Sequence, residues 1–124
     1  MKGWQEEFQR KMVPAEEAAK VVKSGDRIAF TTGREAHAIG LALAARKEEL
    51  RDVKVFVPTP GYDFGWYDPG WEESFTILTA FPLGINKEMV QERRCDLFTG
   101  GLLPFDMEYF KEGVDVLLTE VSLP

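Results

Sequence analysis

The sequence has very few of the residues that form disulfides and metal centres. Its 124 residues include a single cysteine, Cys95, and a single histidine, His37. One cysteine excludes an internal disulfide and agrees with a reducing compartment. One cysteine and one histidine do not have the ligand spacing of a zinc site. We therefore expect no bound metal and a cytoplasmic location.

Long apolar runs and basic clusters are also missing. No apolar run approaches the ~20 residues of a membrane span, and the charged first twenty residues do not resemble a secretory signal. The 15 Lys and Arg residues are outnumbered by 21 Asp and Glu, which gives a formal net charge of -6. An acidic chain without a basic patch is a poor partner for a phosphate backbone. We expect a soluble protein that binds neither membranes nor nucleic acid.

The residues that are present suit one compact domain. An apolar content of 44% over 124 residues can furnish a core, and this length is typical of a single domain, here residues 1–124. Helical and strand patterns alternate, which predicts an α/β fold with an open, mostly parallel sheet and flanking helices. We expect helices at 3–12, 14–24, 36–50, 85–94 (capped by Asn86) and 106–111, and strands at 26–31, 53–57, 75–79, 95–98 and 114–118.

The run 114–121, which includes the last predicted strand, reads as the most buried strand segment of the chain, yet only residues 122–124 follow it. A finished α/β domain would normally cover such a strand with another helix. We therefore expect another segment or chain to cover Leu117, Leu118 and Val121. The 124 residues would then be a piece of a longer polypeptide, or a subunit that docks on another.

The loop after the first strand is a candidate binding site, because ligands of open α/β sheets lie beyond the carboxyl ends of the strands. Thr32, Gly33, Arg34 and Glu35 lie there, before a predicted helix. The Arg34 guanidinium could pair with a carboxylate or a phosphate. The segment matches no phosphate-binding motif, so an ordinary strand-to-helix turn remains the alternative.

A second candidate is the loop from Pro58 to Ser74, which has no helical period and is unusually long for a structureless segment. Its aromatic rings could line an apolar pocket, or they could pack over the sheet edge or against a partner domain. After the fourth strand, the backbone amides of Gly100 and Gly101 could face a ligand, or these glycines could form a plain turn. The aromatic residues of the loop and its end are Tyr62, Phe64, Trp66, Tyr67, Trp71 and Phe75.

A nucleophilic Cys95–His37 pair is not expected. Cys95 begins a predicted strand, whereas His37 follows the carboxyl end of another. In a parallel sheet these two ends face opposite sides of the domain. Cys95 reads instead as a small buried apolar residue.

Several segments resemble the amino-terminal region of the acetyl-CoA hydrolase/transferase family, which includes 4-hydroxybutyrate CoA-transferases. The resemblance spans most of the chain, although each matching piece is short. It departs from the family pattern at Arg34, an added charge, and at Ala36, where a proline is common. The matching segments are 11–18, 24–27, 32–35, 41–50 and 114–122.

The resemblance implies a class I CoA-transferase with two similar α/β domains, of which this chain is the amino-terminal one. The nucleophilic glutamate and its glycine-rich loop would belong to the other domain, so this chain holds no catalytic residue and is inactive alone. Acyl-CoA and a small carboxylic acid would be the substrates, with coenzyme A as a substrate rather than a tightly bound cofactor, and the complete protein would be an oligomer. From their places in the predicted loops, we expect the substrate-binding residues of this part to be Thr32, Gly33, Arg34, Glu35, Tyr62, Trp66, Gly100 and Gly101.

Two functions remain open from the sequence. One is a part or subunit of a CoA-transferase or acyl-CoA hydrolase. The other is a non-catalytic α/β module that binds an acidic metabolite or a protein partner. A downstream domain or a companion subunit with a glutamate nucleophile would favour the first.

Overall fold

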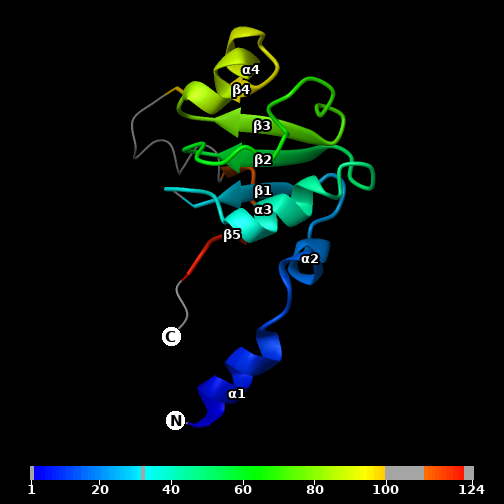
Figure 1. The fold of residues 1–124 in the computed structure, drawn as a ribbon, viewed down its shortest axis with the longest axis vertical. Coiled ribbons are helices and arrows are strands. Elements are labelled where there is room, and N and C mark those ends of the chain that lie inside the picture. The colour runs from blue at the N-terminus through cyan, green and yellow to red at the C-terminus, as the bar shows by residue number, and fades with distance from the viewer. Residues whose placement is uncertain (1, 32, 100–110, 122–124) are drawn as a thin grey trace.

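The protein is a single parallel sheet with helices on one side, seen in a computed structural model that describes residues 2–31, 33–99 and 111–121 (Figure 1). Thr32, Gly100, Gly101 and nearly all of the helix predicted at 106–111 lie outside the described residues. The elements are α1 (Lys2–Lys11), α2 (Ala15–Ala18), the 3₁₀ turn η1 (Ala19–Val21), β1 (Arg27–Phe30), α3 (His37–Ala44), β2 (Val53–Val57), β3 (Phe75–Thr79), the 3₁₀ turn η2 (Gly84–Asn86), α4 (Lys87–Gln91), β4 (Asp96–Leu97) and β5 (Val116–Leu118).

The sheet confirms the predicted α/β architecture. Its strand order is β4-β3-β2-β1-β5, and all four pairings are parallel. Because the strands are parallel, the loops that follow β1 and β2 leave the sheet at the same edge, toward which the arrowheads point in Figure 1. This arrangement brings the two candidate loops together.

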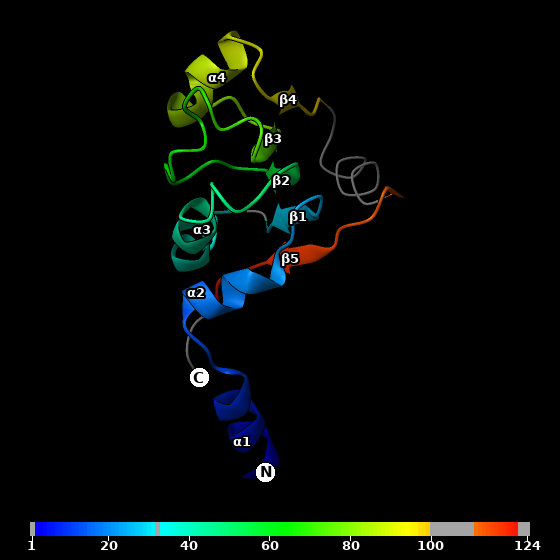
Figure 2. The same ribbon diagram turned by 90° about the vertical axis from the view of Figure 1, so that its right-hand side faces the viewer.

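The main core lies between one face of the sheet and the helices. Val53, Val55, Phe75 and Ile77 point to that face and are buried. The loop 58–74, α3 and α4 lie on the same side of the strands in Figure 2. These four side chains share one face because successive side chains of a strand point to opposite faces.

The helix predicted at 3–12 is found as α1 with the same length, whereas the helices predicted at 14–24, 36–50 and 85–94 are shorter than predicted. The segment expected as a helix at 36–50 is helical only in α3, and its residues 45–49 form turns that end the helix. Here Arg46 reaches η1, where its Nη1 donates to the carbonyls of Ala19 (2.6 Å) and Val22, the residue after η1 (3.0 Å). Tertiary contacts of this kind override the helical period that the sequence carries.

The second and fourth predicted helices also differ from the prediction at their ends. The segment 14–24 forms only α2 and η1. Asn86 is the N-cap residue of α4, as predicted, but its side chain does not bind that helix: its Oδ1 accepts from the Leu83 N–H (2.7 Å) and its Nδ2 donates to the Phe81 carbonyl (3.3 Å). Asn86 is buried and binds the loop that precedes the helix.

The sequence suggested that the last strand is the most buried one, but the structure contradicts this prediction. β5 is a short edge strand that pairs only with β1 in the described residues. Leu118 packs in the chain's own core with 5% exposure, whereas Leu117 is 58% exposed and Val121 is exposed as well. The prediction that all three need another segment to cover them is therefore wrong for Leu118.

The amino-terminal helix α1 extends away from the sheet in both views (Figures 1 and 2). Trp4 on α1 and Met12 directly after it are exposed. Within the described ranges, none of the helices is at once long and apolar enough to cross a bilayer.

Candidate functional site

The carboxyl edge of the sheet joins the two candidate loops through a buried carboxylate. Glu35 follows β1 and is only 1% exposed. Its Oε2 accepts a hydrogen bond from the Gly61 N–H (2.8 Å), and its Oε1 accepts one from the Tyr67 hydroxyl (3.3 Å). Both donors belong to the loop after β2. Glu35 therefore ties that loop to the segment between β1 and α3.

The contact at Gly61 is tight, and a larger residue there would have to displace its neighbours. A Cβ atom at this position would lie 3.0 Å from Cγ of Arg34 and 3.1 Å from Oε2 of Glu35. Such separations are shorter than ordinary van der Waals contacts. The two loops thus meet backbone to side chain at Gly61.

An exposed cluster of polar and aromatic groups lies beside this contact. The Arg34 guanidinium carbon is 5.7 Å from the centre of the Tyr62 ring, a distance that allows a cation–π attraction. The His37 ring centre is 4.5 Å from that of Tyr62. Arg34 and His37 are exposed and Tyr62 is half-buried. These three side chains can present a positive charge and flat apolar surface to a ligand.

The remaining rings of the loop build the core rather than an open wall. Trp66 is fully buried and lies within 6.5 Å, centre to centre, of the rings of Phe30, Phe64, Tyr67 and Phe75. The loop therefore packs over the sheet face, which is one of the two alternatives that the sequence left open. Among the predicted binding residues of this loop, Trp66 supports it from inside and Tyr62 is the half-exposed one.

The Phe64 ring rests directly on the backbone of α3. A Cβ atom at Gly40 would lie 2.4 Å from Cζ of Phe64 and less than 3 Å from two more ring atoms. Only glycine permits this approach. Gly40 was not singled out from the sequence, although a glycine inside a helical pattern is itself a signal of close packing.

The Tyr67 hydroxyl is held in a protonated state by its surroundings. Burial raises the pKa of Tyr67 far above its ordinary value of 10, and the negative charge of Glu35 raises it further. The nearby Trp66 indole N–H lowers the pKa of Tyr67 and so opposes part of the rise. Among the described atoms, Nε1 of Trp66 has no partner in good hydrogen-bond geometry. Tyr67 can therefore act as a donor to Glu35 throughout the neutral range.

The raised pKa of Tyr67 predicts a loss of stability at high pH. The unfolded chain releases the phenol proton at about pH 10, whereas the folded chain retains it, so the free energy of unfolding should fall as the pH rises above 10. Tyr67→Phe should reduce that fall. Denaturant unfolding at pH 8 and at higher pH measures it, with Tyr62→Phe as the control, and an equal slope in wild type and Tyr67→Phe would contradict the assignment.

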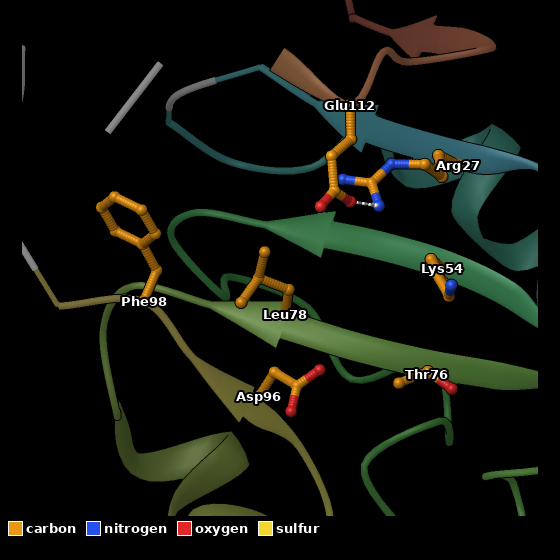
Figure 3. Close-up of a pocket in the computed structure, with 7 residues that line it drawn as sticks. All are labelled: Arg27, Lys54, Thr76, Leu78, Asp96, Phe98 and Glu112. Carbon is orange, nitrogen blue, oxygen red and sulfur yellow. Dashed lines mark hydrogen bonds and ion pairs between the residues drawn. The ribbon is translucent and has the colours of Figure 1, made fainter. Parts of the chain in front are cut away.

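A separate hollow of about 270 Å³ lies on the opposite face of the sheet (Figure 3). Arg27, Lys54 and Thr76 are register partners on three adjacent strands and line it from one side. Arg27 is ion-paired there with Glu112 (2.7 Å). The hollow is separated by the sheet from α3 and from the cluster of Arg34, Tyr62 and His37.

Cys95 and His37 do not form a reactive pair. Cys95 directly precedes β4, at the amino end of a parallel strand, whereas His37 begins α3 after the carboxyl end of β1. Burial raises the pKa of the Cys95 thiol, and the charge of Asp96 adds to this effect, so the nucleophilic thiolate is disfavoured. In the described part of the chain, no three His, Cys, Asp or Glu side chains are grouped to hold a metal ion.

Comparison with solved structures agrees with this fold. RipA from Yersinia pestis superposes with a TM-score of 0.75 at 14% sequence identity, over 89% of this chain and 28% of RipA. Two RipA point mutants superpose similarly, with TM-scores of 0.76 and 0.73 over the same shares of each chain, at 14% and 13% identity. At this level of identity the likeness concerns the fold.

Sequence comparison identifies the family. A protein of Syntrophomonas wolfei subsp. wolfei named "Probable butyrate:acetyl-CoA coenzyme A-transferase" is 51% identical over 51 residues, which are 40% of this chain and 11% of that protein. The matched part of the chain thus covers about a tenth of the length of that relative. The sequence profile of the acetyl-CoA hydrolase/transferase N-terminal domain matches residues 1–62, which is half of the 124 residues. The chain therefore belongs to the acetyl-CoA hydrolase/transferase family.

Proposed function

We propose that this chain is the substrate-binding, amino-terminal part of an acyl-CoA:carboxylate CoA-transferase or acyl-CoA hydrolase. The observation that carries the proposal is the exposed Arg34 guanidinium beside the Tyr62 ring, at the carboxyl edge of a parallel sheet. Ligands of open α/β sheets bind at this edge. A guanidinium is suited to a carboxylate because its N–H groups match the two oxygens.

In the proposed reaction, a glutamate from a companion domain or subunit attacks the acyl-CoA. An acyl-glutamyl anhydride forms first, and the released CoA thiolate then converts it to a glutamyl-CoA thioester while the donor acid leaves. Arg34 would hold the acceptor carboxylate against this thioester, because a transfer between two bound groups gains from orientation. Coenzyme A would enter and leave as a thioester substrate, and no tightly bound cofactor would be needed.

The other predicted residues would have separate roles in the site. Gly33 and Thr32 would line the acceptor position, and Tyr62 would contact the acyl chain. Gly100 and Gly101, which lie outside the described residues, stay predicted substrate-binding residues. The complete protein would be a cytoplasmic oligomer, and Glu35 and Trp66 would support the site from behind because both are buried.

The test of the function is an assay of CoA transfer by the complete protein that contains this chain. Acyl-CoA is supplied with a series of small carboxylic acids, and the new acyl-CoA or the free CoA is measured. We expect turnover by the complete protein and none by the 124-residue chain alone, because the nucleophile lies elsewhere. Binding of an acidic metabolite without any turnover would support the non-catalytic module instead.

Arg34→Ala in the complete protein should weaken the acceptor step selectively. Loss of a charged hydrogen-bond partner costs roughly 1.5–3 kcal/mol, or about one to two decades in acceptor KM. Formation of the glutamyl-CoA thioester from the donor should change much less. Separate measurement of the two half-reactions distinguishes these effects, and Arg93→Ala, at an exposed arginine after α4, is the matched control. An unchanged acceptor KM would remove Arg34 from the site.

A further inference from the structure

We propose that Glu35 is a positioning residue, which fixes the loop 58–74 so that Tyr62 and Arg34 are held at the acceptor site. This inference rests on the proposed function for its catalytic consequence, and on the structure for its geometry. Glu35 has both oxygens engaged by one loop, at Gly61 and at Tyr67. With 1% of its surface exposed, its carboxylate is directed into the protein and acts on a ligand through these partners.

A buried carboxylate is a costly way to hold a loop, which argues for a geometric role. Removing a carboxylate from water is unfavourable unless hydrogen bonds compensate it. An apolar side chain of similar size would fill the space at lower cost, but it would not direct two acceptors at two defined points of the loop. Among the described residues, the ion pairs of the chain do not include Glu35. Its partners are the neutral donors of the loop.

The hydrogen bond between Gly61 and Glu35 lies next to two residues of the exposed cluster, Tyr62 and Arg34. Gly61, whose N–H donates to Glu35, directly precedes Tyr62 in the chain. Arg34, on the other side of the contact, directly precedes Glu35. One hydrogen bond of 2.8 Å thus joins the backbone of the Tyr62 segment to the Glu35 side chain, which follows Arg34 in the chain. If this hydrogen bond is lost, the position of Tyr62 is no longer fixed. Its 5.7 Å cation–π contact with Arg34 and its 4.5 Å contact with His37 should then weaken together.

The experiment compares Glu35→Ala, Glu35→Gln and the control Glu48→Ala in the complete protein. Glu48 is an exposed glutamate in the turn after α3. In Glu35→Gln the side-chain carbonyl can still accept from Gly61, while its amide can donate to the Tyr67 hydroxyl, so we expect this variant to retain the loop. Hydrogen exchange of residues 58–66, followed by mass spectrometry, reports the loop itself. Acceptor KM and the rate of the donor half-reaction report the site.

We expect Glu35→Ala to accelerate exchange of residues 58–66 about tenfold or more, with little change in the peptides of β2 and β3. Acceptor KM should rise about tenfold, since small misplacements of binding groups have effects of this size, and the donor half-reaction should change less than about twofold. Adding Arg34→Ala to Glu35→Ala should raise acceptor KM little beyond the single Arg34 variant, because residues that act through one another are not additive. Glu48→Ala should resemble the wild type, and Glu35→Gln should restore most of each property.

Two results would overturn the proposal. One is faster exchange throughout the sheet together with equal slowing of both half-reactions, which would make Glu35 a general stabilising residue. The other is unchanged exchange at 58–66 in Glu35→Ala. Absence of any CoA transfer in the wild-type protein would reject the proposed function separately, and the exchange result would then still decide whether Glu35 positions the loop.

Discussion

Gly40→Ala should destabilise the protein by roughly 1–3 kcal/mol, the usual cost of forcing an extra methyl group into a packed core. The new Cβ would lie 2.4 Å from the Phe64 ring, which has to move. Phe64 contacts Trp66 (4.9 Å between ring centres) and Tyr62 (6.1 Å), so its displacement should loosen the loop 58–74. Denaturant unfolding followed by circular dichroism measures the change.

Gly3→Ala provides the matched control, because it makes the same substitution at a helical glycine with open space around it. Alanine is favoured over glycine in a helix by about 1 kcal/mol, so Gly3→Ala should be neutral or slightly stabilising. Alanine also has the higher helix propensity at Gly40. The destabilisation expected for Gly40→Ala is therefore the difference from the change measured for Gly3→Ala. A Gly40→Ala protein as stable as the wild type would show that the loop has room to shift.

Trp66→Ala should have a still larger effect, a loss of roughly 3–5 kcal/mol in the free energy of unfolding. Trp66 is the largest fully buried side chain of the described residues and joins rings from β1, β3 and the loop. Alanine would leave a cavity at the centre of the main core. The unfolding midpoint in urea, read by circular dichroism, gives the change directly.

Trp4→Ala is the control for that loss. Trp4 is 52% exposed on α1, which extends away from the sheet, so the same substitution should cost less than about 1 kcal/mol. A loss at Trp4 as large as at Trp66 would mean that α1 is packed against something in solution. Comparable small losses at both positions would contradict the core role of Trp66.

Local sequence alone was enough to predict the sheet. β2 and β3 occupy the predicted residues 53–57 and 75–79, because short runs of apolar and β-branched residues between loops have few alternatives to a buried strand. The helical segment between β1 and β2 predicted their parallel pairing, since a parallel pair needs a long crossover. The family was also recognisable from the sequence, in the motifs on either side of β1.

Tertiary structure decided the ends of the helices and the direction of the side chains at the candidate site. Glu35 read as one of four similar loop residues, and its inward direction depends on donors that lie 26 and 32 residues further along the chain. The aromatic loop has no period, so its pattern could not tell a pocket wall from a core. Phe64 is buried against the α3 backbone, where Gly40 leaves room for its ring. Such contacts join distant segments, and no local propensity encodes which partner a side chain will meet.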